Sequence, residues 1–141
     1  MSAASVVRDY YEALERGEPL SPFFAKREDV VKYGIRERLV GDDEIAEGLL
    51  EQTNTTADWH VDSRSLRVSG GNEWAYFTDL VRLSWRRLPE DDRVRFDSRW
   101  SGCLERIDGE WLFVGMHVSA PTDIERGVSD GRTRNGLERA D

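Results

Sequence analysis

The dipeptide Asp108–Gly109 constrains this chain most, because it separates two long runs in which apolar side chains recur. Asp-Gly readily adopts the positive φ angles of a type I′ turn, so residues 93–106 and 111–119 are predicted to form a β-hairpin. If the turn has two residues, Ile107 faces Glu110. That register predicts one face with the pairs Arg99–Val118, Ser101–Met116 and Cys103–Val114, and an opposite face with Trp100–His117, Gly102–Gly115 and Leu104–Phe113.

The remaining signals predict helices before residue 58 and a sheet after it. Ser5 can cap a first helix that Gly17 ends, and Ser21–Pro22 is typical of the start of a second, short helix. Gly41 precedes a third helix with an acidic first turn. Strands are expected at residues 30–33, 59–69, 73–87, 93–106 and 111–119. The predicted fold is α+β: a cone-shaped, curved antiparallel sheet covered on its concave face by three N-terminal helices.

One domain is expected, spanning residues 1–121. Residues 122–141 are polar and nearly free of apolar side chains, so they are predicted to form a flexible tail. No stretch approaches the ~20 apolar residues of a membrane span, and no basic-then-apolar leader opens the chain. A cytoplasmic protein is therefore expected.

The charge balance restricts the possible partners. The chain has 28 acidic and 20 basic residues, a net charge of −8, which argues against nucleic acid or an anionic membrane surface as partner. Lys26 and Lys32 are the only lysines. An acidic, lysine-poor surface is typical of proteins from a salt-saturated cytoplasm, and a GC-rich genome that encodes arginine in place of lysine is the alternative.

The sequence contains no cofactor signature. Cys103 is the single cysteine, so an internal disulfide and a cysteine metal cluster are excluded. The two histidines, His60 and His117, have no ligand-spaced partners, and Gly70–Gly71 reads as a hairpin turn rather than a phosphate loop. We expect neither a metal nor another cofactor.

Three short segments carry a resemblance to a known family. Arg99-Trp100-Ser101, Asp108-Gly109-Glu110-Trp111 and His117-Val118-Ser119 resemble the SnoaL-like group of the nuclear transport factor 2-like superfamily, and the order of elements matches over roughly residues 5–121. The association domain of calcium/calmodulin-dependent protein kinase II and ketosteroid isomerase are relatives. The resemblance implies the cone-shaped fold, which hosts both enzymes and binding modules.

Alternating residues of the strand at 93–106 share one face, which the resemblance implies is the pocket wall. Arg99 would then clamp an anion or carbonyl oxygen. Alternatively, Asp97 pairs with Arg95 and Arg99 at the rim of the cavity. The ligand-binding residues predicted on this face are Arg99, Ser101, Cys103, Val114, Met116 and Val118.

Tyr10 is the first catalytic candidate, because the run from Tyr10 to Gly17 resembles the first helix of ketosteroid isomerase and Tyr10 matches its oxyanion-hole tyrosine. The alternative is a core aromatic on an amphipathic helix. Two positions depart from that enzyme: Ser101 stands at the second oxyanion donor, and Lys32 or a neighbour stands at the general base. Steroid isomerisation by that mechanism is therefore not expected, and Asp97 becomes the predicted base.

The face with Trp100, Phe113 and His117 is predicted to pair two copies of the chain in a homodimer, because so apolar a sheet face needs cover. His117 is accordingly interpreted as an interface residue rather than a catalyst.

The predicted function is a pocket for a small apolar or anionic molecule. The resemblance suggests a cofactor-free cyclase, isomerase or dehydratase that acts on an enolisable carbonyl or carboxylate compound. The alternative is a non-catalytic association or ligand-carrier module that assembles through its sheet face.

Overall fold

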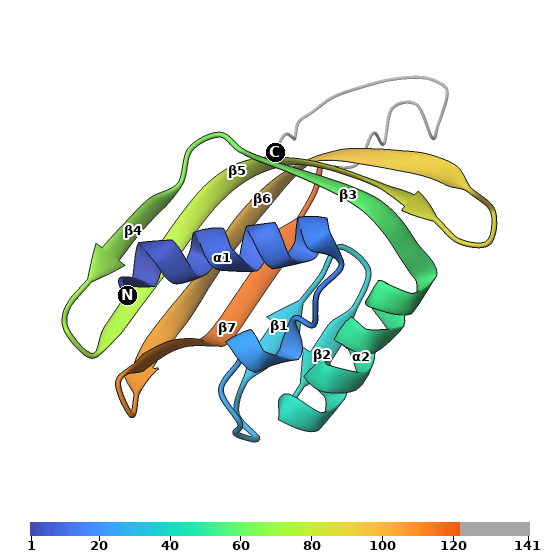
Figure 1. Cartoon of the computed structure of the whole chain (residues 1–141). Helices are drawn as coiled ribbons and strands as arrows, with labels where there is room; N and C mark the ends of the chain where they lie inside the picture. Colours follow the sequence, from blue (N-terminus) through green and yellow to red (C-terminus); the bar gives the residue numbers. More distant parts are fainter. Residues whose placement is uncertain (122–141) are drawn as a thin grey trace.

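The computed structural model describes residues 1–121, which form a curved sheet with helices on its concave side (Figure 1). The predicted tail at 122–141 lies outside these described residues. In chain order the elements are α1 (Ala3–Arg16), the 3₁₀ helix η1 (Ser21–Phe23), β1 (Val31–Tyr33), β2 (Arg38–Val40), α2 (Asp42–Thr55), β3 (Thr56–Ser63), β4 (Arg67–Gly70), β5 (Trp74–Arg87), β6 (Asp92–Ile107) and β7 (Glu110–Ser119).

The helices lie where the capping residues predict, with one shift at the start. Helix α1 is capped by Ser2 rather than Ser5, and the two serines bond reciprocally to each other's backbone N–H groups in a capping box. Gly17 ends α1 at φ 70°, a left-handed conformation that favours glycine. Within residues 1–121, neither α-helix is long and apolar enough to cross a membrane.

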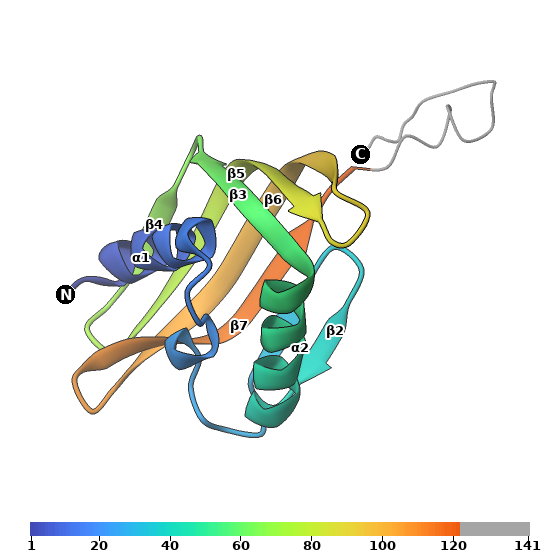
Figure 2. The ribbon, with the colours of Figure 1, turned by 45° about the vertical axis from the view of Figure 1, so that its right-hand side comes forward.

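The strands join in the order β2-β1-β7-β6-β5-β3, with β4 beside β5. The sheet is mixed, because β1 runs parallel to β7 while the other pairs are antiparallel. The single strand predicted at 59–69 is two strands, β3 and β4, and β2 was not predicted. Helix α1 crosses the concave face, and α2 lies beside β2 (Figure 2).

The hairpin register agrees with the prediction only near the turn. Ile107 faces Glu110 and Leu104 faces Phe113, as a two-residue turn requires. A bulge next to Cys103 then shifts the pairing by one residue, so that Trp100 faces Val118. Because a one-residue shift moves every side chain to the opposite face, the predicted partners of β7 beyond the bulge are wrong.

The predicted orientation of β6 is also wrong. Trp100 and Leu104 point to the concave side and are buried there with Phe113 and Met116. Gly102 lies among them because a Cβ atom would come 2.4 Å from the Gly115 carbonyl oxygen and 2.8 Å from the Phe77 ring. The alternating β6 residues predicted to share the pocket face lie on the convex side, where all five are exposed: Arg95, Asp97, Arg99, Ser101 and Cys103.

Candidate functional site

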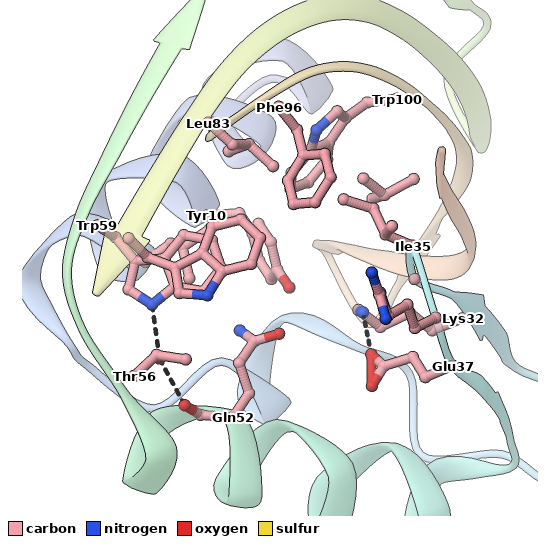
Figure 3. Close-up of a pocket in the computed structure, with 15 residues that line it drawn as sticks. Tyr10, Lys32, Ile35, Glu37, Gln52, Thr56, Trp59, Leu83, Phe96 and Trp100 are labelled. Carbon is pink, nitrogen blue, oxygen red and sulfur yellow. Dashed lines mark hydrogen bonds and ion pairs between the residues drawn. The ribbon is translucent and has the colours of Figure 1, made fainter. Parts of the chain in front are cut away.

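A cavity of about 230 Å³ lies between α1, the β1–β2 hairpin, the end of α2 and the concave face of β3, β5 and β6 (Figure 3). Its walls differ in chemistry. Trp59, Trp85 and Phe96 contribute an aromatic wall, whereas Lys32 and Glu37 contribute a charged end. An apolar cavity with a few fixed polar groups is the usual form of a small-molecule site.

The charged end is built by the tight turn between β1 and β2. The Gly34 N–H donates to the Glu37 carbonyl oxygen at 3.0 Å, which closes the turn, and the Glu37 side chain lies against Gly34. There the carboxylate accepts a hydrogen bond from the Lys32 ammonium group at 2.8 Å. The Lys32 side chain is only 6% exposed and that of Glu37 is 33% exposed. Removing these charges from water costs free energy, and the attraction between them offsets part of that cost.

Tyr10 reaches the same cavity from α1. Its ring is buried, with edge-to-face contacts to four aromatic rings at centroid distances of 5.4 to 6.1 Å: those of Phe23, Phe24, Trp100 and Phe113. Its hydroxyl group points into the cavity and has no hydrogen-bond partner among residues 1–121 (Figure 3). Burial and then the nearby Glu37 carboxylate raise the pKa of Tyr10, so the hydroxyl stays protonated and can donate.

The aromatic wall is a row of three stacked rings. Trp59 and Trp85 stack at a centroid distance of 4.4 Å with 19° between their planes, and Phe96 continues the row at 5.5 Å from Trp85. The Trp59 indole N–H donates to the Thr56 hydroxyl oxygen at 2.8 Å. The Thr56 hydroxyl in turn donates to the Gln52 carbonyl oxygen at 2.6 Å, so the end of α2 fixes the orientation of the wall.

A second buried carboxylate lies outside the cavity. Asp79 accepts hydrogen bonds from the Tyr11 hydroxyl at 2.8 Å, the Ser63 hydroxyl at 2.5 Å and the Ser65 N–H at 2.9 Å. Burial, followed by the bond to Asp79, raises the pKa of Tyr11. These groups join α1 and the β3–β4 connection to β5, which is a structural arrangement.

The structure contradicts the predicted general base. Asp97 projects from the convex face, where its side chain is 75% exposed and pairs with Arg82 at 3.0 Å. It pairs with neither Arg95 nor Arg99, so the alternative of a rim cluster is also wrong in its partners. A carboxylate in this position cannot reach a molecule in the cavity.

The predicted ligand-binding residues divide between the two faces. Val118 lines the cavity, and Met116 is buried on the same side in the core. Val114 lies at the bulge and is half-buried. The prediction that Arg99, Ser101 and Cys103 line the cavity is wrong, because they point to the convex side.

The predicted dimer face is wrong in two of its three residues. Trp100 and Phe113 are buried under α1, at 5% and 1% exposure. His117 alone lies on the convex face, where its ring packs against Tyr33 at a centroid distance of 5.6 Å.

Sequence reasoning missed Glu37 and the aromatic wall, although signals for both exist. Lys32 follows the buried Val30 at a spacing of two, which places a lysine on the inner face and requires an acidic partner nearby. In β6, Phe96 and Trp100 alternate with charged residues, a pattern that by itself places the aromatic side chains inside.

Within residues 1–121, no three His, Cys, Asp or Glu side chains come together in an arrangement that could hold a metal ion. The polar groups that border the cavity instead include the Lys32 ammonium group, the Glu37 carboxylate and the Tyr10 hydroxyl, with Arg36 and Gln52 at its rim.

Comparison with solved structures identifies the fold. A nuclear transport factor 2-like superfamily protein from Salmonella enterica serovar Typhimurium superposes with a TM-score of 0.75 at 17% identity, covering 91% of this chain and 93% of the other. A candidate dehydratase of the same family from Streptomyces avermitilis gives 0.74 at 19% identity, with 84% and 94% covered. A ketosteroid isomerase-like protein from Erwinia carotovora atroseptica gives 0.70 at 18% identity, with 84% and 93% covered.

The sequence itself identifies the family. Residues 3–123 match the SnoaL-like domain, so the chain belongs to the SnoaL-like family, as its hairpin motifs predict. No curated protein matches the sequence.

Proposed function

We propose that the cavity binds a small, mainly apolar molecule with a carbonyl or enol oxygen, and that the protein catalyses proton transfer on it without a cofactor. The observation that carries this proposal is the Lys32–Glu37 ion pair, which lies at one end of a mainly apolar cavity into which the Tyr10 hydroxyl points without a partner in residues 1–121. The reaction class is that of an isomerase, dehydratase or cyclase, all of which begin with formation of an enol or enolate.

The three polar groups divide the reaction between them. The Glu37 carboxylate accepts a proton from the carbon next to the carbonyl group. The electron pair of that C–H bond forms a C=C bond to the carbonyl carbon, and the π pair of the carbonyl group moves onto its oxygen. Lys32 has two N–H donors besides the one bound to Glu37, and Tyr10 supplies an O–H donor, so both can stabilise the developing oxyanion. Return of the proton from Glu37 to a different carbon completes an isomerisation.

The relatives support this class of reaction. The structural neighbours include proteins described as a candidate dehydratase and as ketosteroid isomerase-like. At this site, however, Lys32 is a cation near the position where the isomerase has its base, and Glu37 on the following strand connection supplies the carboxylate.

The test is exchange of the proton next to the carbonyl group, which reports enolisation before any product is known. The protein is incubated in D₂O with small ketones, and loss of the proton signal is followed by NMR. Glu37→Gln should slow exchange by about 10²-fold or more, since a positioned general base contributes that much.

Asp97→Asn is the matched control, because it removes a carboxylate on the convex face. It should exchange at the wild-type rate. Equal exchange in the wild type and Glu37→Gln, with binding of the ketone retained, would refute the catalytic role and leave a ligand carrier.

The alternative of assembly through the sheet rests on a separate observation. Four large apolar side chains are at least 41% exposed on the convex face: Tyr33, Trp74, Tyr76 and Leu80. We propose that this face, rather than the predicted Trp100/Phe113/His117 face, pairs with a second copy of the chain, because an apolar sheet face of this kind needs cover.

Sedimentation equilibrium tests the pairing. The double variant Tyr76→Glu, Leu80→Glu should be monomeric, because it places charges on the pairing face. Leu50→Glu changes an equally exposed residue on α2, at 62% exposure, and should leave the oligomeric state unchanged. A wild-type monomer would refute the proposal.

A further inference from the structure

The two ends of the cavity differ enough to define the shape and chemistry of its ligand. We infer that the ligand is a planar aromatic molecule of one or two rings, whose ring lies against Trp59, Trp85 and Phe96 and whose enolisable or anionic oxygen points to Lys32. This inference rests on the proposed function, because it names the class of molecule on which the same site would act.

The aromatic wall favours a flat ring over a saturated one. Its three rings are half-buried rather than enclosed in the core, and all three border the cavity. They are nearly parallel, with 19° and 29° between successive planes, and the hydrogen bond to Thr56 fixes the orientation of the Trp59 ring. A preorganised set of rings offers stacking and edge contacts that a puckered aliphatic ring cannot match.

The volume sets the size of the ligand. A dry engineered cavity of about 150 Å³ accommodates benzene. The present cavity, at about 230 Å³, is half as large again. It therefore suits one ring with a short substituent or two fused rings, and a steroid with four fused rings would extend out of it into solvent.

The charges at the opposite end determine the substituent. Lys32 and Arg36 are cations that border the cavity, against the single lining carboxylate of Glu37. Arg36 forms no ion pair within residues 1–121. A local excess of positive charge in a chain with net charge −8 favours an enolate, phenolate or carboxylate oxygen at this end.

Polar side chains lie between the aromatic wall and the charged end of the cavity. Figure 3 shows Trp59 and the Lys32–Glu37 pair on opposite sides of the space, with Phe96 above it and the Tyr10 hydroxyl between the two sides. The Gln52 side chain, from the end of α2, completes the rim. A ligand with its ring on one side and its oxygen on the other satisfies both ends at once.

Two ketones with the same carbon skeleton test the inference. 2-Tetralone has one planar aromatic ring fused to the ring that carries the ketone. 2-Decalone is its fully saturated counterpart, with the ketone at the same position. Binding to the full chain is measured by quenching of tryptophan fluorescence and by thermal shift. 2-Tetralone should bind about ten-fold more tightly than 2-decalone, which corresponds to one favourable aromatic contact, and a four-ring steroid ketone should not bind.

Two variants test whether the preference for 2-tetralone over 2-decalone arises from the aromatic wall. Trp85→Leu should reduce it to about two-fold, because the central ring of the wall is lost. Trp111→Leu is the matched control, since Trp111 is also half-buried but does not border the cavity, and it should keep the full preference. Phe96→Leu replaces Trp85→Leu if the latter does not fold.

The outcomes separate this inference from the proposed function. Equal binding of the two ketones, with proton exchange that depends on Glu37, overturns the aromatic ligand class and leaves the catalytic proposal intact. A preference for 2-tetralone without exchange supports the ligand class and refutes catalysis. If neither ketone, nor the anionic two-ring probe 2-naphthoate, binds at millimolar concentration, both are overturned.

Discussion

Two neighbouring tyrosines of α1 each lie near a carboxylate, and the two environments differ in how far their hydrogen bonds are satisfied. Tyr11 donates to Asp79, which accepts two further hydrogen bonds and is 3% exposed. Tyr10 points into the cavity, where its hydroxyl has no partner within residues 1–121, and the nearby Glu37 accepts one bond, from Lys32. Both tyrosines are buried.

The difference separates a structural site from a reactive one. A carboxylate that accepts bonds from three neutral donors has little capacity left for a ligand and holds the surrounding chain segments together. A carboxylate with one partner, beside an unused donor and an accessible space, can exchange a proton with a bound molecule. Burial alone therefore does not identify the functional acid, because Asp79 is more buried than Glu37.

The largest effect on stability is expected at Asp79. Asp79→Ala should reduce the free energy of unfolding by about 3 kcal/mol, because it leaves the buried Tyr11 hydroxyl and the Ser65 N–H without an acceptor. Urea denaturation followed by tryptophan fluorescence measures this change. Asp97→Ala, on the exposed face, should change the free energy of unfolding by less than about 0.5 kcal/mol. Equal losses in the two variants would show that Asp79 has no special structural role.

The next effect distinguishes the two tyrosines themselves. Tyr11→Phe should cost about 1.5 kcal/mol, because it removes a hydrogen bond to a charged acceptor. Tyr10→Phe removes a hydroxyl that has no partner in the described chain, so it should leave stability nearly unchanged while slowing proton exchange in D₂O. A loss of stability in Tyr10→Phe as large as that in Tyr11→Phe would show that both hydroxyls are structural.

A further effect is the dependence of stability on alkaline pH. Folding raises the pKa of both tyrosines, chiefly through burial, so the unfolded chain releases their protons at lower pH than the folded chain. The two hydroxyl groups contribute fully to the free energy of unfolding below the unfolded pKa of about 10. That contribution is lost as pH rises toward the pKa values of the folded state. Wild-type stability should therefore fall steeply above about pH 10.

The variants resolve each tyrosine's share of that slope. Replacing either tyrosine by phenylalanine removes one titrating proton. The decrease of the free energy of unfolding with pH should then be smaller by about 1.4 kcal/mol per pH unit. Urea midpoints measured between about pH 10 and 12, above the unfolded pKa of tyrosine, give the slopes. An unchanged slope in Tyr10→Phe would mean that the Tyr10 hydroxyl reaches solvent in the folded protein.

Local sequence signals predicted most of the elements of this fold. Gly17, Gly41 and the Asp108–Gly109 turn mark their boundaries because each residue type has a backbone preference that acts without the rest of the chain. The motifs around that turn also predicted the family, which the match over residues 3–123 confirms.

The candidate site was predicted less well, and the reasons are specific. The pocket wall was assigned to the face with Asp97 and Arg99 because of the resemblance, although the alternation of Phe96 and Trp100 with charged residues placed the other face inside. The bulge then moved Val118 opposite Trp100. Gly115, beside the bulge, was a signal for it, because glycine within a strand often marks such an irregularity.

The sequence by itself determined the α+β class, the family, the principal hairpin and the position of Tyr10 on the inner face of the first helix, because these depend on turn chemistry and periodicity within short segments. Only the tertiary structure decided that Glu37 pairs with Lys32 and that Trp59, Trp85 and Phe96 form one wall. The ion pair depends on how the turn between β1 and β2 folds, and the wall joins side chains of β3, β5 and β6, whose approach depends on the curvature of the sheet. Neither property is encoded in the spacing of residues along a single strand.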